Sequence, residues 1–217
     1  MIGHSWPALE ENVSWKNWNP GLDNDHLTLG EVLDTLPASN PSDIPFIVRL
    51  FENPNPPIRF PELFPLPGAI NLERHDAIHC LLGRGLLPQD EAFVIGFTMG
   101  ATRNCMPWHF SFFRFIGKYL YPKFYKFSNE DLLALDLGYN KGKESLASDL
   151  GHFPFERFRD FTLKQLRDRL GISRQKLYAV YRVEKMMLPH TKESGRLDYE
   201  WMNTDPSYTK STEVKNA

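Results

Sequence analysis

The stretch that decides the fold runs from residue 75 to residue 91 and reads HDAIHCLLGRGLLPQDE. His75, Asp76 and His79 fall within one arc of a helix, because residues one and four positions apart lie about 100° and about 40° around its axis. The glycines that follow end this helix, and Pro88 suits the first turn of a second one. Glu91 then lies roughly opposite His79 in an antiparallel helical hairpin. The sequence therefore predicts two imidazoles and two carboxylates converging on one point.

These four side chains form a candidate metal site. Histidines combined with carboxylates suit zinc, and they suit Fe(II) where two histidines and one carboxylate leave coordination positions open. The spacing differs from that of HExxH metalloproteases, because an Asp follows the first His directly and no Glu precedes the second. A hydrogen-bonded surface helix without metal is the alternative for the histidine pair. We expect a divalent metal ion, zinc first and Fe(II) or Mg²⁺ as alternatives, at His75, Asp76, His79 and Glu91.

Composition describes a globular protein with one core. The chain has 217 residues, of which 41% are hydrophobic and 24% charged, and one domain is the default at this length. The net charge of −2 argues against a nucleic-acid partner, because phosphate binding needs a basic footprint. Cys80 and Cys105 form no CxxC pair and favour a reducing compartment. No apolar run reaches the length of a membrane span, and the first residues resemble neither a secretory signal nor a presequence. We therefore expect a cytoplasmic protein, peripherally associated with a membrane at most.

The hydrophobic pattern predicts an all-α fold, a single-domain helical bundle with a proline-rich connector and irregular termini. We expect an irregular segment at 1–24 with tryptophans packed onto the core, a helical domain at 25–198 and a mobile polar tail at 199–217. Six prolines between residues 53 and 67 predict a stiff, packed loop. Ser173 is expected to cap the last long helix, and another helix is expected to start at Ser42. The remaining helices are expected at roughly 29–36, 69–83, 89–103, 108–121, 129–149, 161–170 and 173–188.

The expected helix from 89 to 103 is apolar almost all round. Such a helix is buried or lines an apolar cavity. Gly96 and Gly100 lie four residues apart, so their face lets another backbone or a chain-like ligand approach closely. Tight helix packing is one interpretation. Because the helix begins beside the proposed metal, the other is a lipid-tail groove at Phe93, Gly96, Phe97 and Gly100.

Residues 112–127 interleave eight aromatic side chains with four cations and no acid. Aromatic rings at headgroup level with cations facing anionic lipids form an interfacial anchor. This interpretation places Lys118, Lys123 and Lys126 on a membrane surface. The alternative is that the rings face the core and the cations face solvent. Stacking of single-stranded bases is disfavoured by the net charge.

The HDxxHx(11)E motif resembles the signature of the coenzyme Q (ubiquinone) biosynthesis protein 4 family. Weaker similarities are a YxxGK stretch at 139–143 and LRDRLGI at 166–172, and the resemblance covers roughly residues 25–190. It implies a mostly helical, dimeric protein at a membrane surface, with zinc held by the four motif residues. It further implies loss of the C1 carboxyl group of a polyprenylated 4-hydroxy-3-methoxybenzoate, and the organisation of other ubiquinone-biosynthesis enzymes. Without a presequence, a prokaryotic member is expected.

Such a decarboxylation fits these residues chemically. An open-sided metal can bind a carboxylate or phenolate and act as a Lewis acid, and Fe(II) is the natural metal if oxygen replaces the carboxyl group. A carboxylate that is not a ligand, or His109, can move the proton; for His109 the alternative is a hydrogen-bonded histidine near the core. We expect a metal-dependent decarboxylase acting on a polyprenylated hydroxybenzoate. The alternatives are a non-catalytic isoprenoid-lipid scaffold, in which the metal staples the hairpin, and an HD-type phosphohydrolase.

Overall fold

The computed structural model describes residues 14–37, 72–120, 126–147 and 150–197. Within these residues every regular element is a helix, and the one β-type contact is an isolated bridge between Thr28 and Thr162. The prediction of an all-α fold is confirmed. The helix predicted from Ser42, the proline-rich connector at 53–67 and the polar tail at 199–217 lie outside the described residues.

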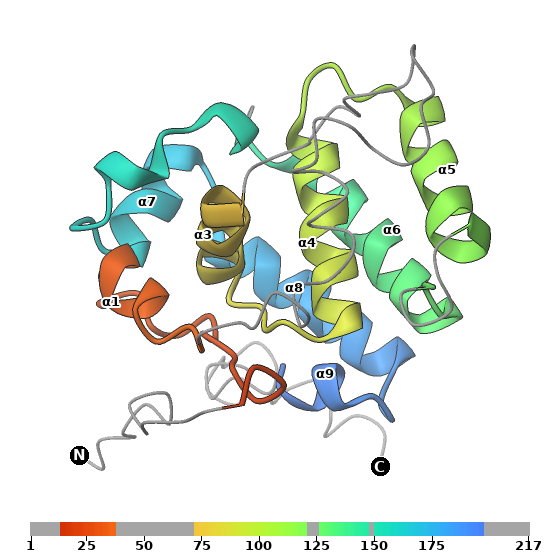
Figure 1. Ribbon diagram of the computed structural model, residues 1–217, viewed down its shortest axis with the longest axis horizontal. Helices are drawn as coiled ribbons and strands as arrows, with labels where there is room; N and C mark the ends of the chain where they lie inside the picture. The colour runs from red at the N-terminus through yellow and green to blue at the C-terminus, as the bar shows by residue number, and fades with distance from the viewer. Residues whose placement is uncertain (1–13, 38–71, 121–125, 148–149, 198–217) are drawn as a thin grey trace, which may run out of the picture.

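The described part of the chain contains eight α-helices and three short turns of 3-10 or π type (Figure 1). α3 and α4 lie next to each other in the middle of the view, α6 lies beyond α4, and α8 runs behind. None of the described helices is long and apolar enough to cross a lipid bilayer. The α-helices are α1 (Leu29–Leu33), α3 (Leu72–Leu82), α4 (Pro88–Ala101), α5 (Pro107–Phe115), α6 (Asn129–Glu144), α7 (Leu163–Leu170), α8 (Arg174–Met187) and α9 (Lys192–Gly195).

Two helix ends differ from the expected ones. α5 gives way to a π-helical turn, η2 (Ile116–Leu120). α6 ends at Glu144 rather than near 149, because Ser145 adopts an extended conformation and its N–H bonds to the carbonyl of Gly142. Two 3-10 turns, η4 (Leu150–His152) and η5 (Phe155–Arg157), then lead to α7.

Side-chain caps fix where several helices begin. Thr162 Oγ1 accepts the N–H of Gln165 at the start of α7, and Gln165 returns a bond to the N–H of Thr162. Ser173 caps α8 by accepting the N–H of Lys176, as predicted. Such caps satisfy backbone donors that a helix leaves unpaired in its first turn.

The irregular segment before α1 reaches the core through one tryptophan. Trp18 is fully buried, and its Nε1–H donates to Thr35 Oγ1 at 3.0 Å. Trp15 is partly exposed, and Trp6 lies outside the described residues. The packing expected of the tryptophans is therefore seen at Trp18.

The turn between α3 and α4 has the predicted construction. Gly83 has a φ of 65°, a left-handed conformation that other residues rarely adopt. The N–H of Gly83 bonds to the carbonyl of Cys80 at 3.3 Å, and that of Arg84 bonds to the carbonyl of His79 at 3.0 Å. This pair of bonds is a Schellman motif that closes the helix. Pro88 begins α4 at its first position, so the chain reverses within five residues.

The last carbonyl groups of α3 are bonded by side chains from α7 and α8. Arg167 Nε donates to the carbonyl of Leu81 at 2.8 Å, and the hydroxyl of Tyr181 donates to the carbonyl of Leu82 at 2.6 Å. All four residues are buried, where an unpaired carbonyl is costly. These bonds fix the α3–α4 hairpin against α7 and α8.

α4 and α6 pack backbone to backbone through their glycines. A Cβ atom built on Gly96 would lie 2.2 Å from the carbonyl oxygen of Leu135, and one built on Gly100 would lie 2.1 Å from that of Tyr139. Neither distance leaves room for a side chain. The face of α4 that carries these two glycines is therefore filled by α6.

The glycines of α6 likewise lie against backbone carbonyl groups of α4. A Cβ on Gly138 of α6 would lie 2.2 Å from the carbonyl oxygen of Phe93, and one on Gly142 would lie 2.2 Å from that of Phe97. The two phenylalanine side chains are 0% and 1% exposed. Tight helix packing is the correct interpretation, because the α6 backbone occupies the space that a lipid tail would need. The predicted lipid-tail groove is wrong at Phe93, Gly96, Phe97 and Gly100.

Candidate metal centre

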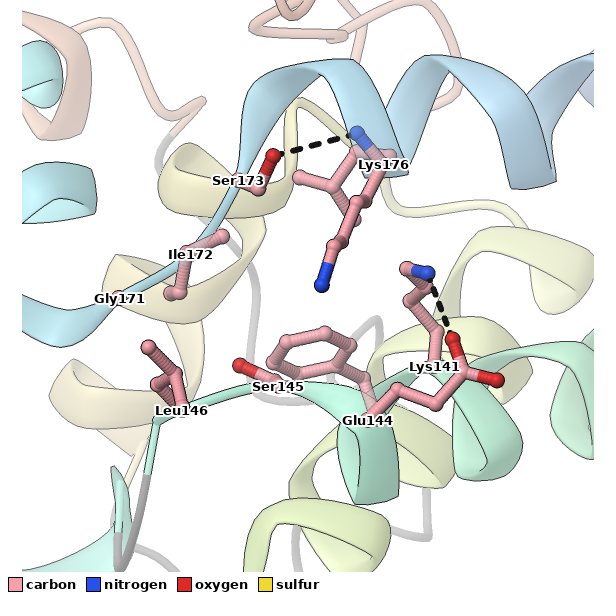
Figure 2. A pocket seen from close by; sticks show the side chains of 10 residues that line it. Lys141, Glu144, Ser145, Leu146, Gly171, Ile172, Ser173 and Lys176 are labelled. Atoms are coloured by element: carbon pink, nitrogen blue, oxygen red, sulfur yellow. Dashed lines mark hydrogen bonds and ion pairs between the residues drawn. The ribbon is translucent and has the colours of Figure 1, made fainter.

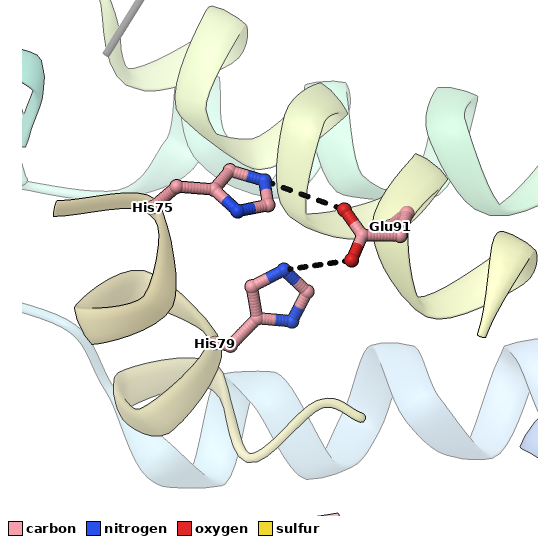
Figure 3. A group of neighbouring side chains, drawn as sticks. All are labelled: His75, His79 and Glu91. Carbon is pink, nitrogen blue, oxygen red and sulfur yellow. Dashed lines mark ion pairs between the residues drawn. The ribbon is translucent and has the colours of Figure 1, made fainter. Parts of the chain in front are cut away.

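Three side chains from the two helices of the hairpin converge on one point (Figure 3). His75 and His79 lie one turn apart on α3, and Glu91 lies in the first turns of α4. His75 Nε2 is 3.4 Å from Glu91 Oε2, and His79 Nε2 is 3.4 Å from Glu91 Oε1. One nitrogen or oxygen ligand atom from each residue lies within 4.8 Å of the other two. The spacing in the sequence has therefore produced one site.

The distances in this site fit a tetrahedral metal ion. Zinc bonds of about 2.0–2.1 Å at tetrahedral angles place neighbouring ligand atoms about 3.3–3.4 Å apart. Both imidazole–carboxylate separations are 3.4 Å. A direct N–H···O hydrogen bond is shorter, at about 2.7–3.2 Å. The two distances run to different oxygens of Glu91, and one ligand atom from each of the three residues lies within 4.8 Å of the other two, so the group is compact enough to hold a metal ion.

The donor atoms are buried and lack hydrogen-bond partners. His75 Nε2, His79 Nε2 and Glu91 Oε2 are all inaccessible to solvent and have no hydrogen-bond partner, and both imidazoles contact the Glu91 carboxylate only as ion pairs at 3.4 Å. A buried polar atom without a partner costs about 1–3 kcal/mol, more if it is charged. A cation between the three atoms would satisfy all of them at once.

The ring of His79 is oriented by a backbone carbonyl on its far side. Its Nδ1 lies 3.4 Å from the carbonyl oxygen of Arg84. With the proton on Nδ1 facing that carbonyl, the lone pair of Nε2 faces Glu91. Metal-bound histidines are commonly held in this way by a second partner.

Burial and charge act in opposite directions on the two best-buried ligands. Burial alone lowers the pKa of His79, but the negative charges of Glu91, Asp76 and Asp90 outweigh that effect, so the pKa is raised. Burial alone raises the pKa of Glu91, but the charges of His79 and His75 outweigh it, so the pKa is lowered. Without a metal the site therefore favours an imidazolium beside a carboxylate. A metal ion replaces that proton when it binds.

Asp76 is not among the converging ligands. Its Oδ1 lies 3.9 Å from His75 Nδ1, on the side of the ring that faces away from Glu91, and its side chain is 22% exposed. The predicted set of four ligands is thereby corrected to three, with Asp76 behind the first histidine. At 3.9 Å this contact is an ion pair and not a hydrogen bond.

His109, predicted as a possible acid or base, makes a hydrogen bond at the start of α5. Its Nδ1 accepts the backbone N–H of Met106 at 3.0 Å, at the start of α5. Its ring contacts that of Trp108 at an interplanar angle of 35°, with centroids 3.7 Å apart. Within the described residues it does not belong to the group around Glu91.

Asp76 is more exposed than the three converging ligands. His79 is 0% exposed and Glu91 5% exposed, while His75 is 6% exposed. Asp76, beyond His75, is partly exposed.

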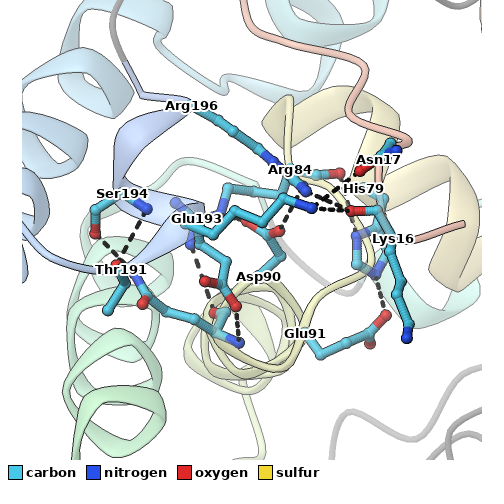
Figure 4. A network of polar contacts seen from close by, with 12 residues as sticks. Lys16, Asn17, His79, Arg84, Asp90, Glu91, Thr191, Glu193, Ser194 and Arg196 are labelled. Atoms are coloured by element: carbon cyan, nitrogen blue, oxygen red, sulfur yellow. Dashed lines mark hydrogen bonds and ion pairs between the residues drawn. The ribbon is translucent and has the colours of Figure 1, made fainter.

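A buried ionic network beside the site was missed by sequence reasoning (Figure 4). It is built on Arg84 and on Glu184 of α8, both 0% exposed, whose side chains pair at 2.8 Å. One signal was present in the sequence. Glu184 lies seven residues after Leu177 and four before Leu188, on the apolar face of α8, where a lone carboxylate needs a buried cation.

A separate cavity of about 90 Å³ lies between the end of α6 and the start of α8 (Figure 2). Its wall includes Leu146, Ile172 and two lysines, of which Lys141 pairs with Glu144 at 2.9 Å. None of the three metal-site residues lines it. This cavity is not a path to the metal position.

No family model, curated protein or solved structure matches this chain. The resemblance to the coenzyme Q biosynthesis protein 4 family therefore rests on the HDxxHx(11)E motif and the weaker similarities at 139–143 and 166–172. The ubiquinone pathway, the dimer and the choice of zinc stay predictions.

Proposed function

We propose that this protein binds a divalent metal ion, zinc first, and uses it to remove the carboxyl group from a polyprenylated hydroxybenzoate ring. The observation that carries the proposal is the convergence of buried ligand atoms without hydrogen-bond partners from His75, His79 and Glu91. Three protein ligands are the number found in catalytic zinc sites, which keep a fourth position for water or substrate. Zinc fits the mixed nitrogen and oxygen ligands, and the two-histidine, one-carboxylate set also fits Fe(II).

The protein residues have separate tasks in this proposal. A bound metal supplies a Lewis acid for a carboxylate or phenolate oxygen. In this proposal Asp76, partly exposed and not among the converging ligands, delivers a proton to the ring carbon that carries the carboxyl group. That carbon gains the proton, its bond to the carboxyl carbon breaks, and carbon dioxide leaves with aromaticity restored.

A membrane face is proposed at α5 and η2. Trp108, Phe115 and Tyr119 are 52%, 51% and 55% exposed, and the rings of Phe115 and Tyr119 lie 5.1 Å apart. Residues 103–127 contain five Lys or Arg and no acid. Exposed aromatic rings flanked by cations suit the headgroup region of an anionic bilayer. Because α6 fills the glycine face of α4, the proposal leaves the polyprenyl tail of the substrate in the bilayer.

A second function, a non-catalytic lipid-binding scaffold, is favoured by one observation. The three ligands are between 0% and 6% exposed, as expected for a metal that staples the hairpin. Structural metal sites contribute directly to the stability of small folds. An enzyme would release carbon dioxide from the bound lipid, whereas a scaffold would bind the lipid unchanged.

The test is release of carbon dioxide from a polyprenyl 4-hydroxybenzoate by the full-length protein loaded with zinc or Fe(II). The proposal expects turnover by the parent and by His190→Ala, a control on a histidine whose side chain is 67% exposed. It expects none by Glu91→Gln. If the metal-loaded parent binds the lipid without releasing carbon dioxide, the scaffold function replaces the enzyme.

The membrane face is tested separately by flotation with phosphatidylserine-containing vesicles. The double variant Trp108→Ser, Phe115→Ser is expected to lose most of its binding. Met186→Ser, which removes a side chain 73% exposed on α8, is the matched control and should bind like the parent. Equal flotation of all three proteins would remove α5 from the proposal.

A further inference from the structure

Arg84 contacts the supports of two metal ligands from opposite helices. Its carbonyl oxygen lies 3.4 Å from Nδ1 of His79. Its guanidinium Nε lies 3.0 Å from Oδ1 of Asp90, and its Nη2 lies 3.5 Å from the carbonyl oxygen of Gln89. These two residues directly precede Glu91. One residue in the turn therefore contacts the imidazole of α3 and the segment that carries the carboxylate of α4.

The guanidinium is itself held firmly by α8. Arg84 Nη1 and Nη2 donate to the two carboxylate oxygens of Glu184 at 3.1 and 2.8 Å, a bidentate geometry that restricts orientation. The guanidinium carbon lies 4.7 Å from the ring centroid of Phe93 and 5.1 Å from that of Tyr181. Arginine packs well on aromatic rings in this way. The position of Arg84 is thus determined from several sides.

The first turn of α4 depends on these contacts. Its N-cap, Leu87, makes no side-chain hydrogen bond to the helix. The side-chain amide of Gln89 (Nε2) instead donates to Oε1 of Glu184 at 2.5 Å and to Ser194 Oγ of α9 at 3.0 Å. The start of α4, and with it Glu91, is therefore held by the same carboxylate that fixes Arg84.

We infer that Arg84 is a positioning residue for the metal centre, which sets the separation between the His79 imidazole and the Glu91 carboxylate. The inference rests on the proposed function, in which these two side chains bind the metal. Glu184 of α8, a hundred residues further along the chain, fixes the Arg84 guanidinium in place. Neither residue is a ligand. Both act through the residues they hold.

The test compares two variants with a matched control, all in the full-length protein. Arg84→Lys keeps the charge but loses the bidentate fork. Glu184→Gln keeps the shape but removes the buried negative charge. The control is Arg167→Lys, because Arg167 is a second buried arginine (2% exposed) that bonds to the end of α3 without touching a ligand side chain.

Two readouts are measured for each protein, zinc affinity by competition titration and the visible absorption of the Co²⁺-substituted site. Arg84→Lys and Glu184→Gln are expected to weaken zinc binding by about 10–100-fold and to change the Co²⁺ spectrum, which reports ligand geometry. Arg167→Lys is expected to lower the melting temperature while both readouts stay at parent values. If Arg84→Lys does not fold, Glu184→Gln decides the result.

The outcomes separate this inference from the proposal beneath it. A parent protein that binds no zinc overturns the metal function and the inference together. A parent that binds zinc, with folded Arg84→Lys and Glu184→Gln variants of equal affinity and equal Co²⁺ spectrum, overturns the positioning role alone. An equal loss of affinity in Arg167→Lys also overturns it, because the effect would then follow general destabilisation.

Discussion

Nε2 of His79 lies 3.4 Å from Oε1 of Glu91, although the two atoms belong to antiparallel helices. A short turn with a left-handed glycine at its start brings them together. Each residue alone would be a buried polar group in need of a partner. Their separation is longer than a good hydrogen bond and matches two ligands of one ion.

Zinc affinity is expected to rise with pH. The pKa of His79 is raised above its ordinary value of 6.5, and that of Glu91 is lowered below its ordinary value of 4.5. At pH 6 the imidazole therefore holds a proton that competes with the metal. Each displaced proton contributes up to about tenfold in affinity per pH unit. Competition titrations at pH 6, 7 and 8 measure this effect, and a flat profile would contradict it.

The stability of the metal-free protein should depend on pH in the opposite sense. A raised His79 pKa stabilises the fold at low pH, and this contribution is lost as pH rises through the folded-state value. The lowered Glu91 pKa gives a contribution that is lost only on strong acidification. Thermal unfolding in chelator should therefore show a stability decline above neutral pH that added zinc reverses. Stability in chelator that rises over this range would be the opposite result.

Replacing a glycine between α4 and α6 should destabilise the fold strongly. Gly138→Ala would bring a Cβ to within 2.2 Å of the carbonyl oxygen of Phe93, and overpacking of this kind costs about 1–3 kcal/mol or more. Gly195→Ala is the control, because a Cβ there meets nothing within 4 Å. Urea unfolding measures both. Equal stability of the two variants would mean that the helices are not in contact at these glycines.

Tyr181→Phe should weaken the anchoring of the hairpin on α8. The substitution removes the hydroxyl that donates to the buried carbonyl of Leu82 at 2.6 Å, and an unpaired buried acceptor costs about 1–3 kcal/mol in the free energy of unfolding. Tyr119→Phe, at a side chain 55% exposed, should change that free energy by less than about 0.5 kcal/mol. An unaffected Tyr181→Phe protein would show that Leu82 finds another partner.

The hairpin and its ligands were predictable because their determinants are local. Gly83 and Pro88 mark the turn by their own backbone preferences. The helical period places His75 and His79 on one face. The turn between the two helices can be only a few residues long, so the position of Glu91 opposite His79 could be predicted. For the same reason the N-cap at Ser173 was predictable.

The remaining features depend on contacts between distant parts of the chain. Gly96 and Gly100 showed that something approaches α4 closely, but the sequence could not distinguish the α6 backbone from a lipid tail. The pairing of Arg84 with Glu184 spans a hundred residues. The place of Asp76 behind the ring of His75, rather than beside it, depends on side-chain rotamers. The spacing of residues along a helix does not determine contacts of these kinds.

The most direct test of the metal centre is an equilibrium zinc titration of the chelator-treated, full-length protein. The expected result is one zinc per chain in the parent and in His190→Ala, with affinity reduced more than about 100-fold in Glu91→Gln by loss of a ligand. Absence of stoichiometric binding in the parent, or equal affinity in Glu91→Gln, would contradict a metal centre at His75, His79 and Glu91.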